Sequence, residues 1–201
     1  MNKILKDAFV LLAITLVAGL LLGIVYSVTL DPINTQNQKK KEEACKEVFQ
    51  DADSFESYDF DSDAMTSLMA EEGLDKVTVD EIYTAKDASG SELGYVITVT
   101  DGEGYGGDIQ FSMGIASDGT INGISILSIS ETAGLGMKAN TDEFKSQFVN
   151  KKVEKFTVTK TGATSDDEID ALSGATITTN AVTNGANGAI LAFNNLEGGS
   201  N

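Results

Sequence analysis

Histidine, arginine and tryptophan are absent from this 201-residue chain, and cysteine and proline occur once each. Without histidine, the chain cannot build a Ser-His-Asp hydrolase, a Cys-His protease or a histidine-bound zinc or haem site. A single cysteine, Cys45, also excludes an internal disulfide and a thiolate metal cluster. Cys45 lies at helical spacing from Val48 and Phe49, so we predict a buried packing role for it. Redox chemistry in this chain would need an organic cofactor.

Positive charge is scarce beside negative charge. The chain has 14 basic residues, all lysine, against 31 acidic residues, which gives a formal net charge of −17. Such a surface repels phosphate backbones, so nucleic acid is not an expected partner. One exception is the run Lys39, Lys40 and Lys41, which could touch lipid headgroups or form a solvated helix face. The sequence leaves both interpretations of that run open.

Charge is missing altogether from Ala8 to Leu30, a run of 23 residues. A helix of that length is about 34 Å long, enough to cross a hydrocarbon core of about 30 Å. We therefore predict a transmembrane anchor. A cleaved signal peptide is the alternative, because Lys3 and Lys6 precede the run, but the run is long and its exit lacks an Ala-x-Ala pattern. Lysines flank both ends, so the positive-inside count does not decide the orientation.

The rest of the chain is predicted to be α+β, with an antiparallel sheet and flanking helices after a single N-terminal transmembrane helix. Asp31-Pro32 predicts the end of the membrane helix. A charged helix is expected over about 36–52, followed by irregular, acidic chain over 51–63. The predicted organisation is a tail at 1–7, an anchor at 8–30, a helical and acidic linker at 31–75, one domain at 76–197 and a tail at 198–201.

Alternation of apolar and polar residues predicts the strands of this domain. They are expected over 77–82, 94–100, 109–115 and around 121–126, with a turn at Asp118-Gly119 joining the last two in an antiparallel meander. A short helix capped by Asn140 or Thr141 carries Phe144 and Phe148 on one face. One more strand over 156–160 and a final helix over about 180–195 complete the prediction.

The most informative motif is Asp-Ala-Leu-Ser-Gly-Ala-Thr, which ends at Thr176. Its small residues Ser173, Gly174 and Ala175 let the backbone lie close to a bulky anion. Helical periodicity begins just beyond them, and a helix N-terminus offers unpaired N–H groups to a phosphate. Thr176 presents a hydroxyl at that point. The alternative is an ordinary turn before a helix cap.

A near copy of the motif, Thr-Gly-Ala-Thr, ends at Thr164. It has Val158 at the position that corresponds to Asp170 in the first motif, and acidic chain comes after it in place of a helical segment. We predict that this copy is a loop without a ligand, because a motif needs its structural context.

Two other glycine-rich segments follow predicted strands. Asp-Gly-Glu-Gly-Tyr-Gly-Gly over 101–107 joins the second and third strands, and Glu-Thr-Ala-Gly-Leu-Gly over 131–136 follows the fourth. The first could be a flexible loop with Tyr105 at its tip. The second could be a strand-to-helix turn with Leu135 buried.

Taken in order, the three motifs resemble the FMN-binding domains in which a flavin transferase attaches the flavin, through its phosphate, to a threonine. The transferase pattern is Asp, two variable residues, Ser or Thr, then Gly-Ala-Thr. The resemblance implies that Thr176 carries a covalent FMN and that the transferase recognises Asp170. It also implies flavin contacts for Ser173, Gly174, Ala175, Glu131, Thr132, Leu135, Gly136, Tyr105 and Gly106. Ala133 stands where some members have proline, a difference that affects loop stiffness.

Within these domains the chain is similar to the G subunits of Rnf-type ion-translocating ferredoxin:NAD oxidoreductases. That resemblance implies an electron relay without catalytic residues or a metal site of its own, bound to other membrane subunits, with its flavin domain outside the cytoplasm. One alternative is the C subunit of the sodium-translocating NADH:quinone reductase. Another is a membrane-anchored binding module without flavin, and a third is an extracytoplasmic flavin-dependent reductase of a soluble acceptor.

Overall fold

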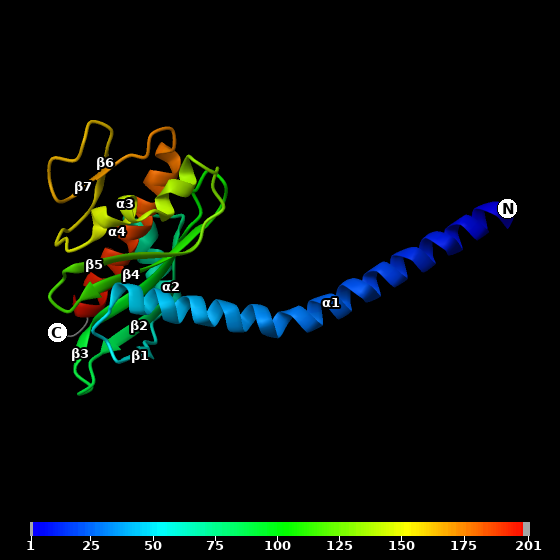
Figure 1. Ribbon diagram of the computed structural model, residues 1–201, viewed down its shortest axis with the longest axis horizontal. Helices are drawn as coiled ribbons and strands as arrows, with labels where there is room; N and C mark the ends of the chain where they lie inside the picture. The colour runs from blue at the N-terminus through cyan, green and yellow to red at the C-terminus, as the bar shows by residue number, and fades with distance from the viewer. Residues whose placement is uncertain (1, 199–201) are drawn as a thin grey trace. The chain divides into compact units, whose positions relative to one another are not determined.

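The computed structural model describes residues 2–198. The chain divides into two compact units, with the boundary between Lys40 and Lys41. Helix α1 spans Asn2–Val48, so its C-terminal end belongs to the second unit (Figure 1). Residues 199–201 of the predicted C-terminal tail lie outside the described residues.

Helix α1 is the one helix in the described part of the chain that is long and apolar enough to cross a membrane, with a mean hydropathy of 2.8 over its most apolar window. The predicted helix end at Asp31-Pro32 is wrong, because α1 continues through Pro32. Proline lacks one N–H donor and restricts the residue before it, but it does not forbid the helix. The carbonyl that loses its partner is that of Val28, four residues earlier and near the end of the apolar run.

The second unit is built on a five-stranded antiparallel sheet with the strand order β1-β2-β3-β4-β5. The strands are β1 (Ser54–Ser57), β2 (Val77–Lys86), β3 (Glu92–Asp101), β4 (Ile109–Ala116) and β5 (Ile121–Ser128). The predicted meander of four strands is confirmed as β2 to β5. Strand β1 lies in the segment that was expected to be irregular. Helix α2 (Ser62–Glu71) was not predicted. Helix α2 begins where the Asp61 carboxylate accepts the N–H groups of Asp63 and Ala64, each at 3.0 Å.

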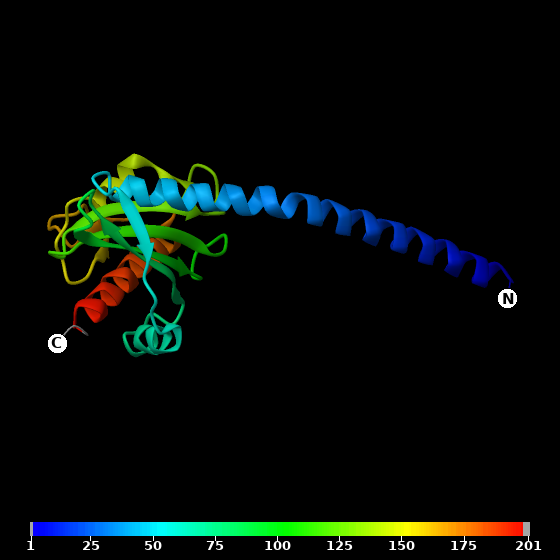
Figure 2. The ribbon, with the colours of Figure 1, turned by 90° about the horizontal axis from the view of Figure 1, so that it is seen from below.

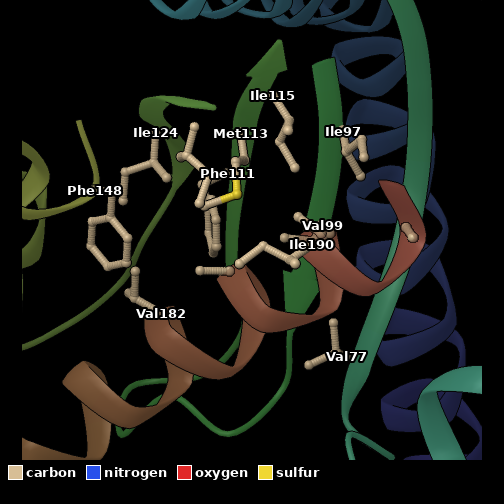
Figure 3. Close-up of a cluster of buried hydrophobic side chains, with 14 of the residues drawn as sticks. Val77, Ile97, Val99, Phe111, Met113, Ile115, Ile124, Phe148, Val182 and Ile190 are labelled. Atoms are coloured by element: carbon tan, nitrogen blue, oxygen red, sulfur yellow. The ribbon is translucent and has the colours of Figure 1, made fainter. Parts of the chain in front are cut away.

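Each face of the sheet packs against a helix. Ile97 on β3 belongs to the larger apolar cluster, which lies between the sheet and α4 (Thr176–Gly198), as Figure 3 shows. The preceding residue, Val96, belongs to a smaller cluster with Cys45 and Val48. Both of these come from the C-terminal end of α1, which lies on the opposite face of the sheet from α4 (Figure 2). Successive strand side chains point to opposite faces, so β3 serves both clusters.

The close approach of α1 to the sheet requires a glycine on β4. A Cβ atom at Gly114 would lie 2.8 Å from the Cβ of Val48. Cys45 is buried, as predicted, and burial raises the pKa of its thiol to about 11.

The chain after β5 forms short elements that lead to α4. They are η1 (Gly136–Asn140), α3 (Asp142–Lys145), η2 (Ser146–Phe148), β6 (Thr157–Thr159) and β7 (Glu168–Asp170), and β6 pairs with β7 in parallel. Thr141 is the N-cap residue of α3, and Phe144 and Phe148 pack edge to face with ring centroids 5.8 Å apart. The final helix begins at Thr176, earlier than predicted.

Candidate functional site

Three loops of the second unit surround one cavity of about 610 Å³. The first is the glycine loop, residues 102–108, between β3 and β4. The second is residues 129–135, between β5 and η1, and the third is the turn of residues 171–175, before α4. The cavity is lined by Tyr105, Glu131, Thr132, Leu135, Gly136, Gly174, Ala175, Thr176, Ile177 and Thr178. All three motifs of the sequence therefore meet at one place.

Thr176 borders this cavity as the first residue of α4. The first N–H groups of a helix have no partner within it, and they carry the positive end of the helix dipole. The residue before Thr176 is Ala175, which has no side-chain oxygen to cap them. The α4 N-terminus thus offers free donors beside a half-buried hydroxyl, an arrangement suited to a phosphate group.

The turn before Thr176 is held by hydrogen bonds on both sides of Gly174. The Thr179 hydroxyl accepts the N–H of Leu172 and donates to the carbonyl of Ala175, both at 3.0 Å. The N–H of Ala175 donates in turn to the carbonyl of Leu172 at 2.9 Å. Gly174 has φ +76°, a conformation that glycine adopts without strain. This turn therefore fixes where α4 and its first hydroxyl begin.

Glu131 connects two of the loops. It is 9% exposed, and its Oε1 accepts the N–H of Gly106 in the glycine loop at 3.2 Å. Its Oε2 is buried without a hydrogen-bond partner. A Cβ atom at Gly136 would lie 2.7 Å from this oxygen and 2.6 Å from the hydroxyl oxygen of Thr178. Glycine at 136 is thus what lets the carboxylate approach the first turn of α4.

A second buried carboxyl lies where β3 ends and the glycine loop begins. Asp101 is fully buried, and its Oδ1 accepts the N–H of Glu103 at 2.6 Å while its Oδ2 has no partner. Burial raises the pKa of Asp101 to about 6, and the nearby charges of Glu103 and Asp108 act in the same direction. Asp101 was not recognised in the sequence, because one aspartate at a strand end carries no signal of burial.

Apolar side chains stand exposed around the cavity. Tyr105 is 72% exposed, Ile177 52% and Leu135 43%, and all three line it. Among the described residues of the second unit, the only other large apolar side chain that is exposed is Val149. Single exposed apolar residues are ordinary, but three around one cavity indicate a surface that a ligand or partner covers.

Most of the predicted flavin contacts border the cavity. Those that line it are Tyr105, Glu131, Thr132, Leu135, Gly136, Gly174, Ala175 and Thr176, whereas Ser173 and Gly106 do not. Asp170, which was predicted as a contact of the transferase and not of the flavin, also lies outside the cavity lining. Gly106 still joins the site through its hydrogen bond to Glu131. The prediction omitted Ile177 and Thr178, although their place in the first helical turn beside Thr176 was a usable signal.

The second Thr-Gly-Ala-Thr segment forms a loop, as predicted. Thr164 donates both its N–H (2.7 Å) and its hydroxyl (2.9 Å) to one oxygen of Glu168, and β7 follows in place of a helix. Thr164 and Asp170 line a different hollow of about 600 Å³. That hollow contains the ion pair of Lys151 with Asp166 and has no exposed apolar rim, so we do not assign the site to it.

The cavity around Thr176 fits a flat aromatic ring that carries a phosphate. Apolar side chains can cover the ring, the α4 N-terminus can receive the phosphate, and the unpartnered Oε2 of Glu131 can accept a ring N–H. FMN has all of these groups. Within the described residues, no group of three or more His, Cys, Asp or Glu side chains is arranged to hold a metal ion.

Comparison with known proteins also indicates FMN. The family model of the FMN-binding domain matches residues 104–191. The chain is 33% identical to the G subunit of the Na(+)-translocating ferredoxin:NAD(+) oxidoreductase complex of Acetobacterium woodii, over 96% of this chain and 93% of that protein. It is also 33% identical to the G subunit of the ion-translocating oxidoreductase complex of Methanosarcina acetivorans, over 94% of each chain.

A third relative is the G subunit of the proton-translocating ferredoxin:NAD(+) oxidoreductase complex of Clostridium ljungdahlii, 30% identical over 91% of this chain and 88% of that protein. The three similarities cover nearly the whole length of the chain and include the segment that matches the FMN-binding domain. The chain therefore belongs to the family of Rnf-type G subunits of ion-translocating oxidoreductase complexes and contains an FMN-binding domain.

Proposed function

We propose that this chain relays electrons through an FMN joined by a phosphoester to Thr176, as a subunit of a membrane-bound, ion-translocating ferredoxin:NAD oxidoreductase. The observation that carries the proposal is the position of Thr176. Its hydroxyl lies at the first residue of α4, at the border of the cavity where all three motif loops meet. Membership of the G-subunit family supports the choice of complex.

In this proposal different residues of the site bind the phosphate and the ring of FMN. The free N–H groups at the start of α4 receive the phosphate, and Gly174 and Ala175 let the backbone lie against it. Tyr105, Leu135 and Ile177 cover the ring, which removes their apolar surface from water. The bound flavin supplies reversible one- and two-electron chemistry, and the protein tunes it by packing, hydrogen bonds and charge.

The same proposal covers the partners and location of the chain. The apolar run of α1 anchors it in the membrane beside the other subunits of the complex, with the flavin domain on the extracytoplasmic side. A flavin transferase acts on the domain during maturation, and Asp170, which is exposed on β7, is part of the surface that it recognises. Electron relay needs no substrate acid or base from this chain, which agrees with the absence of histidine.

Covalent attachment is tested by co-expressing the full chain with a flavin transferase and denaturing the product. We expect the intact mass of the wild type to rise by one FMN, with an in-gel fluorescent band, and Thr176→Ala to lose both. Thr164→Ala is the matched control, because it removes a hydroxyl from the second Thr-Gly-Ala-Thr segment. It should be modified like the wild type.

A colourless wild-type chain of unmodified mass would contradict the proposal and favour an anchored binding module. Modification that persists in Thr176→Ala would contradict the assignment of the attachment residue.

A further inference from the structure

Two buried carboxylate oxygens in the described residues have no hydrogen-bond partner, and one of them, Oε2 of Glu131, borders the cavity. Leaving a buried acceptor unpaired costs free energy, so such a group calls for an explanation. A flavin ring N–H could bond this oxygen, but a neutral acceptor would serve equally well, so the negative charge of Glu131 needs its own explanation.

Two glycines leave the space that the Glu131 carboxylate occupies. A Cβ atom at Gly104 would lie 3.1 Å from Oε1, and one at Gly136 would lie 2.7 Å from Oε2. The hydrogen bond from the Gly106 N–H holds Oε1 toward the glycine loop. With Oε1 engaged, Oε2 remains as an acceptor at a fixed point of the cavity wall.

A fixed negative charge at this point opposes the addition of another. A flavin that accepts one electron without a proton becomes an anion, and charges interact more strongly at a water-excluded site than in bulk water. In the described chain the cavity is lined by no lysine that would offset the carboxylate. Its charge should therefore disfavour the reduced, anionic flavin.

We propose that Glu131 is a positioning residue that holds the glycine loop through Gly106 and lowers the midpoint potential of the flavin bound beside it. This inference rests on the proposed function. It assigns Glu131 an electrostatic task that Thr132 and Leu135, the neighbouring residues of the same motif, cannot perform because they carry no charge.

The test compares the FMN-loaded wild type with Glu131→Gln in a spectroelectrochemical titration of the full chain, with dithionite as the electron donor. Glutamine keeps one oxygen that can accept the Gly106 N–H, removes the charge and replaces the second oxygen with an NH2 group. We expect the midpoint potential to become more positive. A unit charge about 6 Å away at an effective dielectric constant of about 20 changes the equilibrium about a hundredfold, which is about 118 mV for one electron.

Asp108→Asn is the matched control, because it removes the same charge from an exposed position in the glycine loop that does not line the cavity. Its potential should move much less, since solvent screens exposed charges. A second measurement, amide hydrogen exchange of the flavin-free chain, should show faster exchange at Gly106 in Glu131→Ala and near wild-type exchange in Glu131→Gln.

The outcomes separate the two proposals. If wild type and Glu131→Gln both carry FMN but have the same potential, or if the variant is more negative, the inference about Glu131 is overturned while the proposed function stands. If Asp108→Asn shifts the potential as much as Glu131→Gln does, the effect is general surface charge and the inference is also overturned. A wild type without FMN would overturn the proposed function itself.

Discussion

Asp101 is the buried acid at the start of the glycine loop, and its surroundings make folding sensitive to pH. Its pKa rises from 3.8 to about 6, chiefly because burial disfavours the charged form. Between these two pH values the folded chain holds a proton that the unfolded chain has released. The contribution of Asp101 to the free energy of unfolding is therefore fully present below about pH 4 and is lost as the pH rises through 6. The loss from this group is roughly 3 kcal/mol.

We therefore predict that Asp101→Asn is more stable than the wild type at pH 7.5, by up to roughly 3 kcal/mol, and that the difference shrinks toward zero at pH 4. Asparagine keeps an oxygen for the N–H of Glu103 and cannot ionise. The measurement is chemical unfolding of the full chain in detergent micelles, followed by tyrosine fluorescence at both pH values.

Asp118→Asn provides the control of opposite sign. The hydrogen bond from the N–H of Thr120 holds the pKa of Asp118 below its ordinary value. The wild-type carboxylate therefore stabilises the fold at a pH above the ordinary pKa of an aspartate, and this stabilisation is lost as the pH falls. An Asp101→Asn variant that follows the wild type at every pH would show that the buried carboxyl does not titrate as stated.

At the same scale, single residues limit what the sequence can predict. Thr176 was recognisable because small residues and a helical segment surround it, and its copy at Thr164 was set apart by the acidic residues that come after it in the chain. The unpaired oxygens of Asp101 and Glu131 were not predictable, because burial depends on loops that are distant in the sequence. The exposure of Tyr105 and Ile177 likewise depends on packing.

Among the elements, the first turn of α4 depends on the hydroxyl of Thr179, which joins the two ends of the turn of residues 171–175. We predict that Thr179→Val lowers the free energy of unfolding by about 1–2 kcal/mol, because valine has the same shape but leaves the N–H of Leu172 without its acceptor. Thermal unfolding of the full chain in micelles measures the loss.

Thr183→Val is the matched control, one helical turn further on. The Thr183 hydroxyl is also buried and donates to the carbonyl of Thr179 at 2.8 Å. That carbonyl keeps its backbone partner in the helix, so the substitution should cost less than about 1 kcal/mol. Equal losses in the two variants would mean that the turn does not depend on Thr179.

Elements with a clear period were predictable, and the others were not. Alternation identified β2 to β5, and helical spacing identified α4. Strand β1 was missed because its segment, Ser-Phe-Glu-Ser, lies within acidic chain, and it is a strand because it pairs with β2. Pro32 led to the opposite error, because a helix end was predicted where the helix continues. Pairing with β2 thus made a strand of a segment without a strand pattern, whereas one proline was not enough to end a long helix.

For the whole molecule, the undecided property is the side of the membrane on which the second unit lies. Lys3 and Lys6 precede the apolar run, and the lysines at 39–41 follow it, so charge does not orient the anchor. The extracytoplasmic position of the flavin domain is therefore a prediction, and a reagent that cannot cross the membrane can test it.

A single engineered cysteine can report the orientation of the chain in the membrane, because the native cysteine should not react with a thiol label. Cys45 is 5% exposed, and burial raises its pKa to about 11, so it holds almost no reactive thiolate at neutral pH. Lys160 is exposed in the loop between β6 and β7. We predict that Lys160→Cys reacts with a membrane-impermeant maleimide in intact spheroplasts, whereas the wild type does not react. Labelling that requires lysis would place the domain in the cytoplasm, and with it the proposed flavin.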